Sequence, residues 1–300
     1  MKIGVIGNSI KGSLPDAIET LLKLGSKYNL EFFIHDELSQ LLKKKVGNAL
    51  LQKQYLPSSE LVTESDVIIA FGGDGTILSA ARMVGKSDVP ILGINLGKLG
   101  FLAEVSLEEM EAFIQDVISG QHVIEERMML KTTIEKDKSE LYSLNDVVID
   151  NSTSSRLIHI SVYVNGEYLV SYSGDGIILA TPTGSTAYSL AAGGPIVVPT
   201  TQVIEIQPIS PHSLSARTVI IPDTSTIRIV VEHLSNEARV TADGQTEKIY
   251  TPPLDIYVRK AEYSVKLIKR KDRSYYDVLR TKLLWGSDIR LVKGKSDELD

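Results

Sequence analysis

Apolar residues in the first part of the chain form short runs that alternate with segments of helical spacing. Between two of these runs, Ile18, Leu21 and Leu22 recur at the spacing of one helix face. The runs themselves are typical of buried strands: KIGVIG (2–7), EFFIH (31–35), DVIIAF (66–71) and VPILGIN (89–95). Strand–helix–strand order predicts a parallel sheet covered on both faces. We therefore expect an α/β domain over residues 1–125.

The pattern changes after about residue 125, where short runs alternate apolar and polar positions. Asn165-Gly166, between two such runs, is a strong signal for a two-residue β-hairpin. Further short strands are predicted in TVIIP, TIRIVVEH, ARVTADGQ and PLDIYVR. One helix is expected among them, over residues 185–194. Residues 126–270 are therefore predicted to form a mostly β domain.

The C-terminal segment DRSYYDVLRTKLLWG returns to helical spacing. We expect a helix within residues 271–293 that packs back on the first domain. The polar tail over residues 294–300 is predicted to be disordered.

Composition narrows the classes of function. The chain has 300 residues, 43% of them hydrophobic, no cysteine and a formal net charge of −6. Without cysteine, disulfides, thiol nucleophiles and thiolate metal sites are excluded. Nucleic-acid binding is not expected, because it depends on many phosphate contacts from Lys and Arg. We expect a cytoplasmic protein with no membrane contact, because the sequence shows no signal peptide and no apolar run approaches the ~20 residues that span a bilayer.

An acidic protein that binds an anionic ligand must do so with backbone amides, helix N-termini and hydroxyls. Gly72, Gly73, Asp74 and Gly75 stand where a predicted parallel strand ends and a helix begins. Glycines there let the backbone approach a phosphate, and Asp74 could accept a proton from an attacking hydroxyl or help to hold a cation. The alternative is that Asp74 caps the helix and the glycines only form a tight turn. These residues alone do not decide between the two.

A second stretch, residues 172–199, concentrates glycine and hydroxyl residues after another strand. Thr183, Ser185 and Thr186 present neutral donors and acceptors suited to a ribose or a pyrophosphate. Tyr188 could stack on a base or bond to a hydroxyl. The alternative is an N-capped helix with small residues packed tightly on a sheet.

Together, these motifs resemble the NAD kinase family. The resemblance covers most of residues 1–270 and rests on FGGDGTILSAAR, ILGINLGKLGFLAEV, LNDVVI and DGIILATPTGSTAYSLAAGGPIV, in this order and spacing. Diacylglycerol and sphingosine kinases share the Gly-Gly-Asp-Gly element, and phosphofructokinases have a related form. The long Thr-Gly-Ser block favours NAD kinase among these relatives.

The resemblance implies roles for individual residues. Asp74 would accept the proton of the adenosine ribose 2′-hydroxyl, with the neighbouring glycines lining the site. Asn145 and Asp146 match the family's Asn-Glu pair, which binds the nicotinamide-side ribose, although Asp146 is shorter than the usual glutamate. Ser173 lies close to the position before Asp175 at which many relatives carry arginine. The positions expected to contact or cover NAD also include Phe101, Arg156, Ser173, Asp175, Thr183, Thr186, Ala187, Tyr188, Ser189, Leu190, Ala191, Ser210 and Gln245.

The implied activity is transfer of a phosphoryl group from ATP to NAD, giving NADP. No His/Asp/Glu cluster has the spacing of a protein metal cage, so a divalent cation, Mg²⁺, would be held mainly by ATP phosphates. The family resemblance also implies a homo-oligomer, a dimer or a tetramer. Two alternatives stay open at this point: a lipid kinase of the diacylglycerol type, and a non-catalytic NAD(P)-binding sensor.

Overall fold

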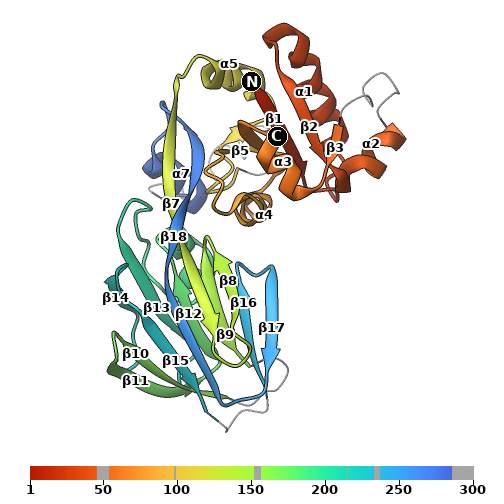
Figure 1. Ribbon diagram of the computed structural model, residues 1–300. Coiled ribbons are helices and arrows are strands. Elements are labelled where there is room, and N and C mark those ends of the chain that lie inside the picture. The colour runs from red at the N-terminus through yellow and green to blue at the C-terminus, as the bar shows by residue number, and fades with distance from the viewer. Residues whose placement is uncertain (46–53, 98, 152–156, 214, 233–236, 286–300) are drawn as a thin grey trace, which may run out of the picture. The chain divides into compact units, whose positions relative to one another are not determined.

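The computed structural model describes residues 1–45, 54–97, 99–151, 157–213, 215–232 and 237–285, and it divides into two compact units (Figure 1). The first unit contains Met1–Ile77, Ile91–Ile124 and a C-terminal part that begins at Ile268. The second contains Leu78–Pro90 and Glu125–Leu267. Each has its own buried apolar cluster.

The first unit is built on a parallel sheet with the strand order β3-β2-β1-β4-β5, and β6 pairs with β5. Its strands are β1 (Lys2–Gly7), β2 (Glu31–His35), β3 (Gln54–Leu56), β4 (Val67–Gly72), β5 (Ile91–Asn95) and β6 (Val105–Ser106). Every residue of β4 and β5 is buried, as expected for strands covered on both faces. The predicted parallel α/β domain is confirmed.

Helices cover this sheet with their apolar stripes. They are α1 (Leu14–Tyr28), the 3₁₀ turn η1 (Asp36–Leu38), α2 (Ser39–Lys45), α3 (Ser58–Glu64) and α5 (Met110–Ile118). The C-terminal part of the unit contains α7 (Tyr275–Leu283). In α1, Ile18, Leu21 and Leu22 are buried in the core of the unit, as their spacing predicts. A capping box between Ser274 and Asp277 starts α7, which has Val278 and Leu279 as its buried residues. The tail over residues 294–300 lies outside the described residues.

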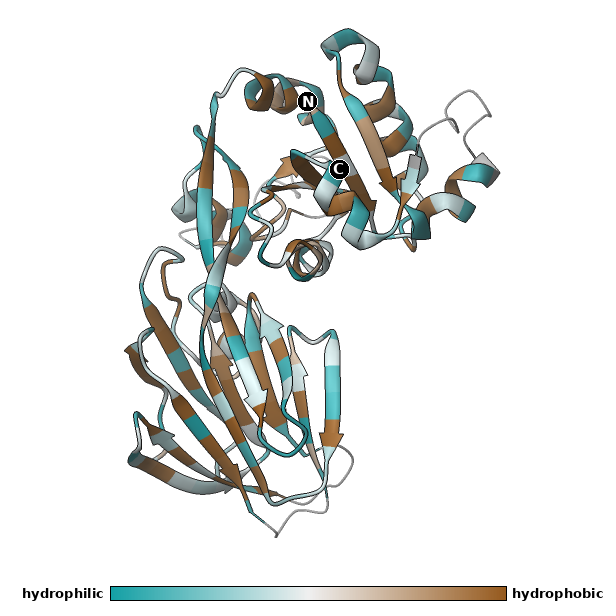
Figure 2. Ribbon diagram, in the orientation of Figure 1, coloured by the Kyte–Doolittle hydropathy of each residue, from teal (hydrophilic) through white to brown (hydrophobic). Residues whose placement is uncertain are grey.

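The second unit contains antiparallel strands, and Figure 2 shows hydrophobic and hydrophilic bands alternating along them. One sheet has the order β14-β13-β12-β9-β16-β17, and β11, β10, β15 and β18 follow one another in the other. The strands are β7 (His122–Ile134), β8 (Ser139–Ser143), β9 (Asp146–Asp150), β10 (Ile158–Val164), β11 (Glu167–Gly174), β12 (Gly176–Ala180), β13 (Val203–Ile209), β14 (Val219–Pro222), β15 (Ile227–Val231), β16 (Ala238–Ala242), β17 (Thr246–Tyr250) and β18 (Leu254–Arg270). Side chains from both sheets form one buried cluster, so the predicted β-rich region is confirmed.

The predicted hairpin is present between β10 and β11. Asn165 and Gly166 have φ angles of 52° and 86°, the left-handed values that a type I′ turn requires. The predicted helix over residues 185–194 was wrong in its length. A 3₁₀ turn, η3 (Gly184–Thr186), is followed by Ala187 at φ −100° and ψ −125°, and only then by the single turn α6 (Tyr188–Ala191).

The reason for this break lies in Ser185. Its buried hydroxyl donates to the Pro182 carbonyl at 2.7 Å and accepts the Val197 N–H at 3.0 Å. These bonds fix the chain in a turn that a continuous helix does not contain, a competition typical of serine near helix starts.

The six-stranded sheet has an inner and an outer face, because strand residues alternate between faces. On β9, Val147 and Ile149 join the core, and Val148 belongs to a separate small cluster on the other face. Ala192, next to α6, packs against that cluster. The polar residues of β9, β13 and β16 that alternate with the core residues therefore face the same side as α6.

Candidate functional site

The Gly-Gly-Asp-Gly element of the first unit forms the turn between β4 and α4 (Asp74–Val84). A Cβ on Gly72 would lie 2.0 Å from the Thr76 hydroxyl oxygen, so this position has no room for a side chain. A Cβ on Gly73 would meet no atom within 4 Å, which leaves its backbone open to a ligand. Gly75 lies exposed in the first turn of α4.

Asp74 is held by a second backbone segment. Its Oδ2 accepts the N–H of Phe101 at 2.9 Å, and its Oδ1 accepts those of Leu102 and Ala103 at 3.0 and 3.2 Å. A Cβ on Gly100 would lie 1.9 Å from Oδ1, so the segment approaches the carboxylate closely. Among the described residues, the donors to Asp74 lie in this segment and not in the first turn of α4. The side chain is therefore oriented by the loop rather than used as a helix cap.

Phe101 is half-buried in the same segment. The Nζ of Lys282, on α7, lies 5.8 Å from the centroid of its ring. Phe101 itself donates its N–H to Asp74, so this contact places a cation beside the ring of a residue that holds the carboxylate.

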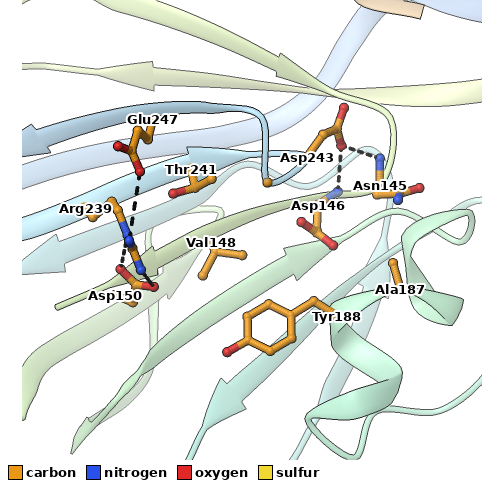
Figure 3. Close-up of a pocket in the computed structure, with 11 residues that line it drawn as sticks. Asn145, Asp146, Val148, Asp150, Ala187, Tyr188, Arg239, Thr241, Asp243 and Glu247 are labelled. Carbon is orange, nitrogen blue, oxygen red and sulfur yellow. Dashed lines mark hydrogen bonds and ion pairs between the residues drawn. The ribbon is translucent and has the colours of Figure 1, made fainter. Parts of the chain in front are cut away.

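In the second unit, the outer face of the six-stranded sheet carries a cavity of about 390 Å³ (Figure 3). Four of the predicted residues line it, namely Asn145, Asp146, Ala187 and Tyr188. They come from β9, the residue before it and the chain around α6. The other lining residues are Val148, Asp150, Arg239, Thr241, Asp243, Gly244 and Glu247.

Asp243 organises one end of this cavity (Figure 3). Its carboxylate accepts the N–H groups of Leu144 at 3.0 Å, Asn145 at 2.7 Å and Asp146 at 3.3 Å. Asp243 and Gly244 have φ angles of 53° and 63° in the turn from β16 to β17. The sequence reasoning missed this role, although the Asp-Gly pair is itself a hairpin signal.

Burial dominates the electrostatics of this end. Asp146 is 4% exposed, and burial together with the neighbouring Asp243 carboxyl raises the pKa of Asp146 to about 7. Burial also raises the pKa of Asp243, while its three backbone donors and the charge of Arg82 act in the opposite direction. The two carboxyl groups therefore form a coupled pair inside the cavity.

The other end of the cavity holds an ion pair. Arg239 on β16 lies opposite Asp150 on β9, and its Nε and Nη2 donate to the two carboxylate oxygens at 2.9 and 2.8 Å. Glu247 on β17 lies 3.9 Å from Nη1 of the same arginine. The sequence reasoning missed this group, because only the strand register brings residues 150 and 239 together.

The hydroxyl-rich turn before α6 packs against the segment that carries Asn145. Thr181 donates its hydroxyl to the Leu144 carbonyl at 2.6 Å, and a Cβ on Gly184 would lie 2.0 Å from the Asn145 carbonyl oxygen. Thr183 accepts a bond from Arg127 at 3.3 Å, and Thr186 donates to the Thr183 carbonyl at 3.2 Å. These threonines therefore help to build the turn itself.

A second cavity, of about 580 Å³, lies next to α6. Tyr188 lines both cavities, while Ala191 and Ser210 line the second. Ser210 has a φ of 43°, an uncommon conformation for serine. The remaining lining residues are Ala192, Gly193, Gln207, Pro208, Ile209, Pro211, Ala216, Arg217 and Thr218.

Other predicted residues are engaged elsewhere in the second unit. Ser173 bonds to Nδ1 of His159 at 3.0 Å, and Asp175 is exposed beside β12. Gln245 accepts bonds from Ser79 and Arg82 on α4.

Two neighbouring positions of α6 differ from Tyr188. Ser189 is fully buried and donates to Glu205, whereas Leu190 is half-buried and belongs to the lining of neither cavity. Arg156 lies outside the described residues.

The described residues contain neither a metal-binding cluster nor a membrane-spanning helix. Over the ranges that the structure describes, no three His, Asp or Glu side chains are grouped closely enough to hold a metal ion. In the same ranges, no helix has the length and apolar character needed to cross a membrane.

Comparison with known proteins gives a consistent result. Residues 3–122 match the ATP-NAD kinase N-terminal domain and residues 144–270 the ATP-NAD kinase C-terminal domain. The NAD kinase of Bacteroides fragilis is 40% identical over 297 residues, covering 97% of the chain and 100% of that protein. The NAD kinase of Sulfurimonas denitrificans is 37% identical over 95% of the chain and 97% of its own length.

Solved structures agree with the sequence matches. A yeast NADH kinase complexed with NADH has a TM-score of 0.87 at 28% identity, covering 97% of the chain and 89% of that one. An NAD kinase from Archaeoglobus fulgidus in complex with ATP has a TM-score of 0.73 at 24% identity, covering 91% and 95%, which is a likeness of fold.

Proposed function

The chain belongs to the NAD kinase family, and we propose that it transfers the γ-phosphoryl group of ATP to the 2′-hydroxyl of the adenosine ribose of NAD, giving NADP. The observation that carries this proposal is the cavity of the second unit, where Asn145, Asp146, Ala187 and Tyr188 converge. The family resemblance assigns NAD binding to the same four residues.

We assign Asp74 as the proton acceptor. Phosphoryl transfer depends mainly on positioning and charge neutralisation, with one carboxylate orienting the attacking hydroxyl. The N–H groups of residues 101–103 fix the orientation of Asp74, and in the described part of the chain its Oδ2 accepts one of them. A carboxylate oxygen has two lone pairs, so Oδ2 can still accept the ribose hydroxyl.

The residues that line the cavity bind NAD in this proposal. Asn145 offers an amide donor and acceptor, and the Asp146 carboxyl can bond to ribose hydroxyls. The Tyr188 ring can stack on an apolar ring of the ligand. Of the other predicted positions, Ala187, Ala191 and Ser210 line the two cavities, where small residues leave room for a dinucleotide.

The divalent cation, Mg²⁺ by this proposal, enters as part of the Mg–ATP substrate, since phosphate oxygens and water are its preferred ligands. A cytoplasmic location suits a chain without cysteine, because disulfides belong to oxidising compartments. A homo-oligomer is the expected state, and gel filtration with light scattering measures it directly.

The test is NADP formation from NAD, ATP and Mg²⁺ by the purified protein, read through an NADP-specific dehydrogenase. Asp74→Asn should lower kcat by roughly 10²–10⁴-fold, the usual contribution of a general base, with little change in NAD affinity. Asp16→Asn is the matched control, because Asp16 is an exposed aspartate in the first turn of α1 in the same unit.

Each other outcome has a distinct meaning. Equal rates for Asp74→Asn and the wild type would keep the kinase and remove Asp74 as the base. NAD binding without NADP formation from ATP would favour a dinucleotide-binding sensor. Phosphorylation of a diacylglycerol with no NADP formed would favour a lipid kinase.

A further inference from the structure

Glu205 on β13 is a buried carboxyl group that the proposed reaction does not use. It is 1% exposed, and its Oε2 has no hydrogen-bond partner among the described residues. Its Oε1 accepts a bond of 2.7 Å from the hydroxyl of Ser189, which is itself fully buried. A buried carboxyl with an unpaired oxygen lowers the stability of the fold. A stabilising role therefore does not explain why a glutamate stands at this position.

The partner of Glu205 lies on α6, a helix of a single turn. A helix this short does not form by itself in water, because the first turn fixes several residues for few hydrogen bonds. Two neighbouring outward residues of β13 hold it in place. Glu205 binds Ser189, and Gln207 donates from Nε2 to the Ala192 carbonyl at 2.9 Å. The position of α6 therefore depends on β13.

Gly194 closes the contact on the other side. A Cβ there would lie 2.2 Å from Glu205 Oε1 and 2.3 Å from Ser189 Oγ. Its N–H donates to the Ser189 carbonyl at 2.8 Å. The chain after α6 thus packs directly on the Glu205–Ser189 pair, with no space for a methyl group.

The residues of α6 next to Ser189 and Ala192 border the cavities. Tyr188 lines both, and Ala191 lines the larger one (Figure 3 shows Tyr188 in the smaller). We propose that Glu205 is a positioning residue for NAD, which fixes α6 through Ser189 and so holds Tyr188 at the ligand. This inference rests on the function proposed above, in which Tyr188 contacts NAD.

Burial disfavours the charged form of Glu205. Burial raises the pKa of Glu205, and the bond from Ser189 offsets part of the rise. Glutamine has the same shape and keeps an acceptor oxygen for Ser189, whereas methionine keeps only the length of the side chain. The two substitutions therefore separate the hydrogen bond from the packing.

The experiment compares Glu205→Gln and Glu205→Met with the wild type by steady-state kinetics, NAD calorimetry and thermal unfolding. Glu205→Met should raise KM and Kd for NAD roughly tenfold, the effect of one buried hydrogen bond, with kcat and KM for ATP little changed. Its unfolding temperature should change by only a few degrees, because removal of the unpaired carboxyl oxygen offsets part of the cost of leaving the buried Ser189 hydroxyl without an acceptor. Glu205→Gln should keep the wild-type KM for NAD. Ser189→Ala should repeat the effect of Glu205→Met without adding to it.

Ser161→Ala is the matched control, since Ser161 bonds to Ser171 at 2.7 Å between β10 and β11 in the same unit. It should leave KM for NAD unchanged. A folded Glu205→Met with wild-type KM and Kd for NAD would overturn the proposal. So would a loss of kcat and of both affinities in proportion to a lower unfolding temperature, because that pattern reports structure alone.

If Glu205→Met does not fold, Gly194→Ala takes its place, because its methyl group would separate Glu205 from Ser189. The same rise in KM for NAD is expected, and an unchanged KM would overturn the proposal. Calorimetry separates this inference from the proposed function. NAD binding that weakens in Glu205→Met, in a protein that makes no NADP, would reject the kinase and keep the positioning role.

Discussion

Two aspartates, one in each unit, are held by the same bonding scheme. Asp74 accepts the N–H groups of residues 101–103, and Asp243 accepts those of residues 144–146. In both cases three consecutive backbone donors bind one carboxyl group. Such an arrangement fixes a side chain more firmly than a single bond, because it leaves few alternative rotamers.

The surroundings of the two carboxyl groups differ. Asp74 is half-buried, beside Gly73, whose backbone is open to a ligand. Asp243 is 9% exposed, with a second buried carboxyl, Asp146, as its neighbour. The same three-donor scheme can therefore orient a carboxylate for chemistry, as at Asp74. At Asp243 it instead fixes the backbone of residues 144–146, which lead into the cavity. The predictions below test this contrast.

The largest effect is expected from Gly100→Ala. Its methyl group would lie 1.9 Å from Asp74 Oδ1, so the carboxylate must leave its three donors. We expect kcat to fall at least ~10²-fold, as for the loss of a general base, with NAD affinity retained because the second unit is untouched. Steady-state kinetics and NAD calorimetry measure the two quantities.

Gly97→Ala is the control for this change, because the nearest atoms to its Cβ would be 3.9 Å away. It should keep the wild-type kcat. Full activity in Gly100→Ala would mean that the observed orientation of Asp74 is not the one that the reaction uses.

An intermediate effect is expected from Asp243→Asn. The amide keeps one acceptor oxygen and turns an NH₂ group toward backbone donors, so at least one buried N–H is left unpaired. The cost should be about 1–3 kcal/mol of unfolding free energy, or several degrees in thermal unfolding. Asp74→Asn should show the reverse balance, with the larger loss in kcat. If Asp243→Asn lowered kcat as much as Asp74→Asn does while its unfolding temperature stayed unchanged, Asp243 would take part in the chemistry. The two aspartates would then not differ in role.

Much of this arrangement could be predicted from local patterns. The apolar runs of β1, β2, β4 and β5 predicted the parallel sheet, and Asn165-Gly166 predicted the β10–β11 hairpin, because each signal is contained in a few adjacent residues. The family resemblance points to Asn145, Asp146 and Tyr188, and these three residues line one cavity.

The missed features depend on distant partners. Asp243 lies 97–99 positions from its three donors, and Asp150 meets Arg239 only through the register of β9 and β16. The helix expected over residues 185–194 is shorter than predicted, because the Ser185 hydroxyl bonds to the Pro182 carbonyl and to the Val197 N–H. Periodicity does not report such pairings, which arise only when the sheet has formed.

The smallest effect concerns the pH dependence of Asp146. Burial raises its pKa to about 7 in the folded protein, whereas an unfolded aspartate titrates near 3.9. Between about pH 4 and 7 the folded protein thus keeps a proton that the unfolded chain has lost, and stability falls as pH rises through this window. The Asp146→Asn variant has an amide that cannot titrate at this position. Between about pH 5 and 8 its unfolding temperature should therefore fall by a few degrees less than that of the wild type. Calorimetric unfolding across this range measures the difference. If the unfolding temperatures of the two proteins changed equally with pH, the proton would reside on Asp243, the other carboxyl of the pair. The group that titrates would then be the carboxyl that binds the N–H groups of residues 144–146.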